Sequence, residues 1–291
     1  MPDSRIPEDP VAELLQVLNL KDSGENSFQG TTQWMPGGRV FGGQVLAQSL
    51  VAASATVDQD RRVHSLHSYF LRPGALDVPI DFEVDILRDG RSFSARRVQA
   101  SQESKVIFSM IASFQIPTDG VEHADKMPTG VSEPETLPSA KNLLGSFDHP
   151  VARYWANARP FDLRHEAESV YLRPATTKSN EQAVWFKPVS ALKIDGPLAQ
   201  AALAYASDYT ILESIMRAHG LSWAHPSLKS ASLDHAMWFH AEPDFSDWML
   251  YVQRSPAAQS SRGLATGQIF NRNGVLVASV AQEGMMRIPA I

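Results

Sequence analysis

Hydrophobic and polar residues alternate along several short runs of this chain, and alternation with a period of two predicts strands that bury one face. The clearest examples are the runs KVIFSMIAS from Lys105 and GVLVASVA from Gly274. Turn sequences separate neighbouring runs, RDGR at Arg88 and NRNG at Asn271. The predicted strands fall into two groups of three: 78–87, 92–101 and 105–115, then 247–255, 262–271 and 274–287.

A helix-like stretch precedes each group of strands. Residues 42–57 and 197–216 are apolar on nearly every face, and Pro197 suits the first turn of a helix. A helix that is apolar all round is a buried helix. We therefore predict one buried helix wrapped by a meandering antiparallel sheet, made twice, which is α+β architecture.

The two halves also resemble each other. Phe70 matches Phe239 and Val106 matches Val275, both at an offset of 169 (239 − 70 and 275 − 106). A constant offset across separate strands indicates duplication. Between the halves, prolines and acids predict a surface linker without long regular elements. The predicted division is an N-terminal domain at 1–116, a linker at 117–158 and a C-terminal domain at 159–291.

Composition narrows the class of protein. The chain has 291 residues, 43% of them hydrophobic, and no cysteine, which excludes disulfides and thiolate chemistry. Its net charge of −6 does not favour nucleic-acid binding. No apolar run reaches the ~18 residues of a membrane helix, and the N-terminus does not resemble a signal peptide. We expect a soluble, cytoplasmic protein with no membrane insertion.

Five ordered motifs resemble those of the TesB-type acyl-CoA thioesterase II family. They are FGGQ at Phe41, LHSYFLRPG at Leu66, LRDGRSFSARRV at Leu87, LDHAMWFH at Leu233 and VASVAQEGMMR at Val277. The resemblance covers roughly Glu13 to Arg287. It implies a double hotdog fold, hydrolysis of acyl-CoA to a fatty acid and CoA, and assembly into a homo-oligomer.

The same resemblance implies three catalytic residues. Matched by motif, the family's acid falls on Asp208, its hydroxyl on Ser232 and its amide on Gln282. Many members are expected to carry Thr at the hydroxyl position, and Ser lacks the methyl group that stiffens the Thr rotamer. A carboxylate, a hydroxyl and an amide together can position and deprotonate a water molecule.

The residues alone leave other roles open for these positions. Asp208 could lie on an exposed helix surface or cap a break in the helix, and Gln282 could end a strand facing solvent. Asp234 is the rival acid, although we expect it to bond nearby backbone or Ser. Gly43 could offer its N–H to the thioester or simply permit close packing. The offset of 169 places Ser113 opposite Gln282, which suggests a single active site per chain.

Two other functions compete with hydrolysis. A hotdog-type acyl-CoA hydratase would need a His/Asp dyad at the start of the helix, where FGGQ has no acid–base residue. A regulatory acyl-CoA binding protein would keep the cavity without turnover. The chain has no GxSxG or HExxH motif, so serine-hydrolase chemistry is unsupported and we expect no metal. We likewise expect no cofactor.

Overall fold

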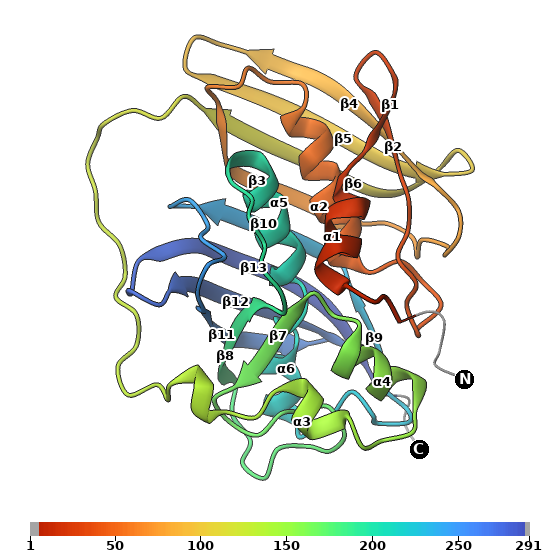
Figure 1. Cartoon of the computed structure of the whole chain (residues 1–291), viewed down its shortest axis with the longest axis vertical. Helices are drawn as coiled ribbons and strands as arrows, with labels where there is room; N and C mark the ends of the chain where they lie inside the picture. The colour runs from red at the N-terminus through yellow and green to blue at the C-terminus, as the bar shows by residue number, and fades with distance from the viewer. Residues whose placement is uncertain (1–5, 289–291) are drawn as a thin grey trace.

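The strands of the two halves join into one antiparallel sheet. The computed structural model describes residues 6–288 and places 13 strands in the order β1-β2-β4-β5-β6-β3-β10-β13-β12-β11-β8-β7, with β9 paired to β13 (Figure 1). The first half supplies β1 (Lys21–Gly24), β2 (Ser27–Gly30), β3 (Arg62–Phe70), β4 (Ile80–Asp89), β5 (Phe93–Gln102) and β6 (Lys105–Gln115). The second half supplies β7 (Phe161–His165), β8 (Glu181–Pro188), β9 (Lys229–Ser232), β10 (Asp234–Phe239), β11 (Met249–Gln259), β12 (Arg262–Asn271) and β13 (Leu276–Arg287).

Pairing of β3 with β10 connects the halves. Leu66 on β3 lies opposite Met237 on β10, and both side chains are buried. The six predicted strands match β4, β5, β6, β11, β12 and β13 within a few residues. A buried helix wrapped by an antiparallel sheet, made twice, is therefore confirmed.

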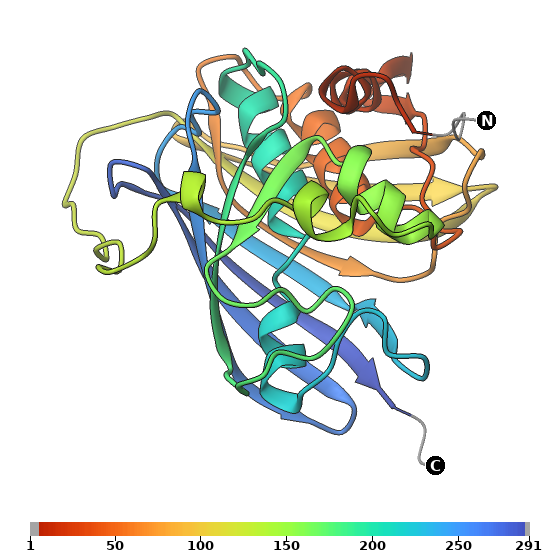
Figure 2. The same cartoon turned by 60° about the horizontal axis from the view of Figure 1, so that its bottom comes forward.

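The two central helices are α2 (Gly42–Ser54) and α5 (Gly196–Ser207). They pack against each other, and both views show them on the same side of the sheet (Figures 1 and 2). Nearly all of their side chains are buried, as expected for helices that are apolar all round. The remaining helices are α1 (Pro10–Leu18), α3 (Ala140–Leu144), α4 (Pro150–Asn157), α6 (Glu213–His219) and the short 3₁₀ helix η1 (Pro134–Thr136).

The second predicted helix, 197–216, is wrong as a single element. It ends at Ser207 and resumes at Glu213, with Asp208 as the C-cap of α5. Side chains from the sheet bind the intervening turn: Gln182 donates to the Thr210 carbonyl (3.1 Å) and Gln253 to the Thr210 hydroxyl (2.6 Å). The turn also keeps backbone bonds of the shorter i to i+3 type, such as that from the Glu213 N–H to the Thr210 carbonyl (2.9 Å). The side-chain bonds add to these, and sequence periodicity does not reveal them.

The segment between the halves changes character along its length. Residues 117–133 run along one side of the molecule without helix or strand, and η1, α3 and α4 then follow (Figure 1). α3 and α4 pack around a small cluster of Leu144, Ala152 and Tyr171. The division at residues 116 and 158 stays a prediction, and its outer ends, 1–5 and 289–291, lie outside the described residues.

Candidate active site

Asp208, Ser232 and Gln282 meet at one point although they lie far apart in sequence. The Gln282 amide Nε2 donates to Asp208 Oδ1 (3.0 Å) and to Ser232 Oγ (2.9 Å). Ser232 also hydrogen-bonds the Asp208 carboxylate. Gln282 is fully buried, whereas Asp208 and Ser232 are partly exposed. The amide that joins the carboxylate and the hydroxyl is thus enclosed by the protein.

Strand pairing brings these groups together. Leu276, Ala278 and Val280 share the buried face of β13, and Gln282 continues it at period two. β9 pairs with the end of β13 so that Ser232 lies opposite Gly284. The carboxylate comes from the C-terminal end of α5, where Asp208 is the C-cap.

Gly42 and Gly43 allow the start of α2 to approach Asp208, and a Cβ on Gly42 would lie 2.7 Å from Asp208 Oδ2. The Gly43 N–H donates to the Asp208 carboxylate. A Cβ on Gly43 would lie 2.5 Å from the Tyr205 carbonyl oxygen and 2.5 Å from Phe41 Cε1, so only glycine fits. The positive end of the α2 dipole thereby faces a carboxylate. The Gly43 N–H thus has a partner within the chain, and a role for it toward a thioester oxygen stays a prediction.

Replacing Gly43 by Ala is expected to separate α2 from α5 and to lower the free energy of unfolding by about 1–3 kcal/mol, the usual cost of overpacking. Urea unfolding measures the change. Gly37→Ala is the matched control, because a Cβ on Gly37 meets no atom within 4 Å. Equal midpoints for the two variants would contradict the close approach.

The pKa of the Asp208 carboxyl group lies closer to neutral pH than the ordinary pKa of an Asp. Burial among protein atoms raises its pKa to about 6, while hydrogen bonds from Gln282, Gly43 and Ser232 work in the opposite direction. An acid with this pKa is mostly ionised at pH 7 and is still basic enough to accept a proton from water.

With Asp208 as the candidate base, kcat/KM is expected to fall about tenfold per pH unit below pH 6, because a protonated carboxyl group cannot accept a proton from water. A pH–rate profile measures the midpoint. Burial also raises the pKa of Asp234. Asp234 is thus the alternative titrating group, and Asp234→Asn is expected to leave the midpoint of the profile unchanged. Loss of the midpoint in that variant would show that Asp234, and not Asp208, is the group that titrates.

Asp234 lies beside the three residues but has a different partner. Its Oδ1 accepts the backbone N–H of Glu283 (2.6 Å), which ties the start of β10 to β13. Ser232 and Asp234 belong to different strands, β9 and β10, with Leu233 between them. The geometry agrees with a structural role for Asp234.

The sequence patterns did not point to His235 as a residue of the site. It is fully buried; its Nδ1 hydrogen-bonds Gln282 Oε1, and its Nε2 lies 3.0 Å from Ser207 Oγ. Burial lowers the pKa of His235 to about 4, so the ring is neutral at pH 7. The available signal was its place at period two with Met237 and Phe239 on the buried face of β10.

The prediction that Ser113 is the first-half counterpart of Gln282 is wrong. Ser113 faces outward, where its hydroxyl bonds His64 (2.8 Å), so it cannot correspond to the inward Gln282. In the sheet, Leu66 pairs with Ala112. His235 corresponds to Leu66 at offset 169, and His235 contacts Gln282 just as Leu66 pairs with Ala112. Ala112 is therefore the first-half counterpart of Gln282, at offset 170 (282 − 112). One extra residue in the second half shifts the register and reverses the face. The amide is still missing from the first half.

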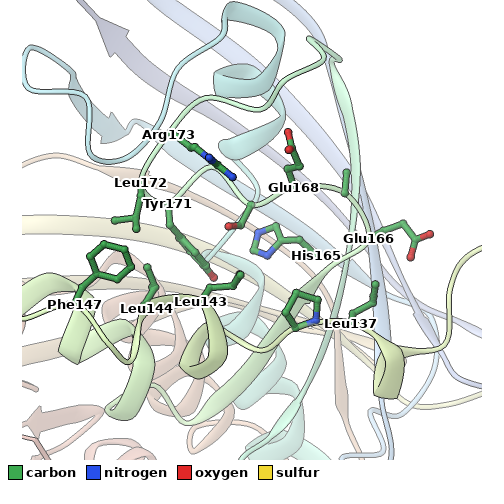
Figure 3. Close-up of a pocket in the computed structure, with 13 residues that line it drawn as sticks. Leu137, Leu143, Leu144, Phe147, His165, Glu166, Glu168, Tyr171, Leu172 and Arg173 are labelled. Atoms are coloured by element: carbon green, nitrogen blue, oxygen red, sulfur yellow. The ribbon is translucent and has the colours of Figure 1, made fainter.

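A cavity of about 730 Å³ lies apart from these residues (Figure 3). Leu143, Leu144 and Phe147 line it on one side, and His165 and Tyr171 also contribute. None of the three candidate catalytic residues lines it.

Behind this cavity, His165 binds a buried acid. Glu213 is 1% exposed and accepts from His165 Nε2 (2.7 Å), Trp223 Nε1 (2.9 Å) and Gln182 Nε2 (3.3 Å). Burial raises the pKa of Glu213, but His165 and Trp223 outweigh it and hold the pKa below its usual value. Glu213 is therefore a buried anion whose stability depends on these donors.

Comparison with known proteins decides the family. A family described as acyl-CoA thioesterase matches residues 160–285, and one described as acyl-CoA thioesterase N-terminal domain matches 31–115. A protein named acyl-CoA thioesterase 2 from Haemophilus influenzae is 37% identical over 94% of this chain and 96% of its own length. The chain belongs to the TesB-type acyl-CoA thioesterase II family. Its members are thioester hydrolases, and this chain is one of them.

Solved structures agree with this assignment. TesB2 of Mycobacterium marinum, described as an acyl-CoA thioesterase II, is 40% identical with a TM-score of 0.77, covering 95% of this chain and 99% of that one. A protein from Alicyclobacillus acidocaldarius described as having a hot dog fold has a TM-score of 0.79 at 18% identity, with coverage of 96% and 99%. The double hotdog fold predicted for this TesB-type chain is therefore confirmed.

Two further observations concern residues 6–288. No helix in this range has the length and apolar character needed to cross a membrane. Within the same range, no three His, Asp or Glu side chains gather in a way that could hold a metal ion.

Proposed function

We propose that this chain hydrolyses fatty acyl-CoA to a free fatty acid and CoA, using a water molecule activated by Asp208, Ser232 and Gln282. The observation that carries the proposal is the pair of hydrogen bonds from the Gln282 amide to the Asp208 carboxylate and the Ser232 hydroxyl. The Haemophilus influenzae relative is likewise named acyl-CoA thioesterase 2.

The chemistry assigns one task to each residue. Asp208 accepts a proton from water, and the resulting hydroxide forms a bond to the thioester carbonyl carbon. The carbonyl electron pair moves to oxygen and returns as the carbon–sulfur bond breaks, which releases CoA as the thiolate. Ser232 contacts the water, and Gln282 holds the carboxylate and the Ser232 hydroxyl in place, so that attack costs little orientational entropy. A thiolate leaves readily, and the demand for a general acid is small.

Release of free CoA thiol from short-, medium- and long-chain acyl-CoAs tests the proposal. Steady turnover on at least one chain length, with fatty acid and CoA formed in equal amounts, is expected. Binding of acyl-CoA without thiol release would favour a regulatory binding protein instead. Conversion of an enoyl-CoA to a hydroxyacyl-CoA without thiol release would favour a hydratase.

A cytoplasmic location and a homo-oligomeric state stay predictions. Cell fractionation checks the first. Light scattering coupled to gel filtration checks the second, because it measures the mass of the particle against the 32.0 kDa of one chain.

A further inference from the structure

The Gln282 amide can serve the proposed site in only one orientation. Its two ends differ, because the NH₂ group donates and the oxygen accepts. An ionised Asp208 carboxylate only accepts, so it needs the NH₂ end. Turning the amide by 180° would place Gln282 Oε1 against Asp208 Oδ1, where two acceptors repel. Some neighbouring group must select the productive orientation.

We propose that His235 is this group: as the neutral tautomer protonated at Nδ1, it is a positioning residue that holds the Gln282 amide with its NH₂ toward Asp208 and Ser232. The inference rests on the proposed function for its catalytic meaning. Its geometric content is the hydrogen bond between His235 Nδ1 and Gln282 Oε1.

The proton count along the chain of contacts is consistent. The Nδ1 proton is donated to Gln282 Oε1, and the two Nε2 protons of Gln282 are donated to Asp208 and Ser232. The remaining ring nitrogen, His235 Nε2, then accepts. Ser207 Oγ lies 3.0 Å from Nε2 and 2.8 Å from the Ala204 carbonyl oxygen, and the proposal requires its single proton to point to Nε2. With the Ser207 proton on that side, every polar atom of the buried amide and ring has one partner of the right kind.

The ring itself is firmly placed. β10 lies between β3 and β13, so strands pair with it on both sides. The His235 carbonyl accepts a further bond from Ser68 Oγ (2.8 Å). Burial keeps the ring neutral, because its pKa is lowered to about 4. A positioning role needs this, since one protonation state must persist over the working pH range.

The first half of the chain supplies an internal comparison. Leu66 and Ala112 occupy the positions that correspond to His235 and Gln282, and both are buried. Where the amide is absent, the histidine is absent too, and apolar packing fills the space. The two residues are therefore present together in one half of the chain and absent together in the other, as expected if the histidine serves the amide.

Nitrogen-15 NMR of the histidine ring tests the tautomer directly in the wild-type protein. We expect His235 Nδ1 to be protonated and Nε2 unprotonated at pH 7, with the signals assigned by their loss in His235→Asn. A proton on Nε2 would overturn the proposal, since Nδ1 would then have to accept from a flipped amide. This measurement does not depend on turnover, so a failure of the proposed function is seen separately, as absent thiol release.

Variants test the consequence for catalysis. His235→Leu removes the donor and should lower kcat about 10- to 100-fold with little change in KM, the range for partners that orient a functional group. The midpoint of the pH–rate profile should also rise in this variant. The Gln282 hydrogen bond lowers the pKa of Asp208, and an amide that is free to turn makes this bond less often. His235→Asn keeps an N–H donor near the Nδ1 position and should recover much of kcat and the midpoint.

Met237→Leu is the control, because Met237 lies two residues along on the same buried face of β10. It should leave kcat and the midpoint unchanged. An equal loss in the Leu and Asn variants of His235, with an unmoved midpoint, would reduce His235 to a packing residue. If His235→Leu does not fold, the NMR measurement on the wild type still decides.

Discussion

Replacing Asp208 by Asn is expected to lower kcat on acyl-CoA by about 10²- to 10⁴-fold, the usual contribution of a general base. Asn has the same shape and keeps an oxygen that can accept from Gln282 Nε2. It cannot take a proton from water at any working pH. KM should change little, because the loss falls on the reaction step rather than on binding. Thiol-release kinetics on the chain length that wild type prefers measure both constants.

Asp234→Asn is the matched control for this experiment. Asp234 is a neighbouring acid whose pKa burial also raises, but its Oδ1 accepts the Glu283 backbone N–H rather than a side chain of the site. We expect a change in kcat of no more than a few-fold. Full turnover in folded Asp208→Asn, with turnover lost in Asp234→Asn, would move the base to Asp234.

Truncation of Glu213 is expected to have the largest effect on stability. Glu213→Ala leaves donors from His165, Trp223 and Gln182 without their shared acceptor in the interior. Breaking a buried pair in this way costs about 3–5 kcal/mol of unfolding free energy. Urea unfolding at pH 7 measures the loss as a lower midpoint.

The contribution of Glu213 to the free energy of unfolding should decrease at acid pH. The pKa of Glu213 in the folded protein lies below the ordinary value of 4.5. Its contribution is therefore complete above about pH 5 and is lost as the pH falls through the folded-state pKa. Glu181→Ala is the control, because the exposed Glu181 carboxylate makes a long ion pair of 3.9 Å with Arg254 Nε. The free energy of unfolding is expected to change by no more than about 0.5 kcal/mol in this variant. Similar midpoints for both variants would show that the Glu213 network adds little.

Much of the fold could be predicted from local pattern. Alternation located β4, β5, β6, β11, β12 and β13, because a strand with one buried face repeats every two residues. All-round apolar character located α2 and α5. The break at Asp208 was only one alternative left open for that residue, because many of the residues after it are also apolar. Hydrogen bonds from Gln182 and Gln253 to Thr210 hold that turn, and both glutamines come from strands.

The candidate site divides in the same way. Motif resemblance pointed to Asp208, Ser232 and Gln282, and the fold brings these three into hydrogen-bond contact. It did not point to His235, whose contact with Gln282 arises only when β10 pairs with β13. It also misplaced the counterpart of Gln282 at Ser113. A shift of one residue leaves the sequence offset almost unchanged but turns the side chain to the opposite face of the sheet.

By itself, the sequence indicated the α+β class, the duplication and the family, and it pointed to three residues that the fold brings into contact. These properties depend on periodicity and on ordered motifs, which are local along the chain. The tertiary structure alone decided the direction of the Gln282 amide, the partner of the Gly43 N–H and the raised pKa of Asp208. These depend on burial and on hydrogen bonds between segments far apart in sequence, which no local pattern encodes.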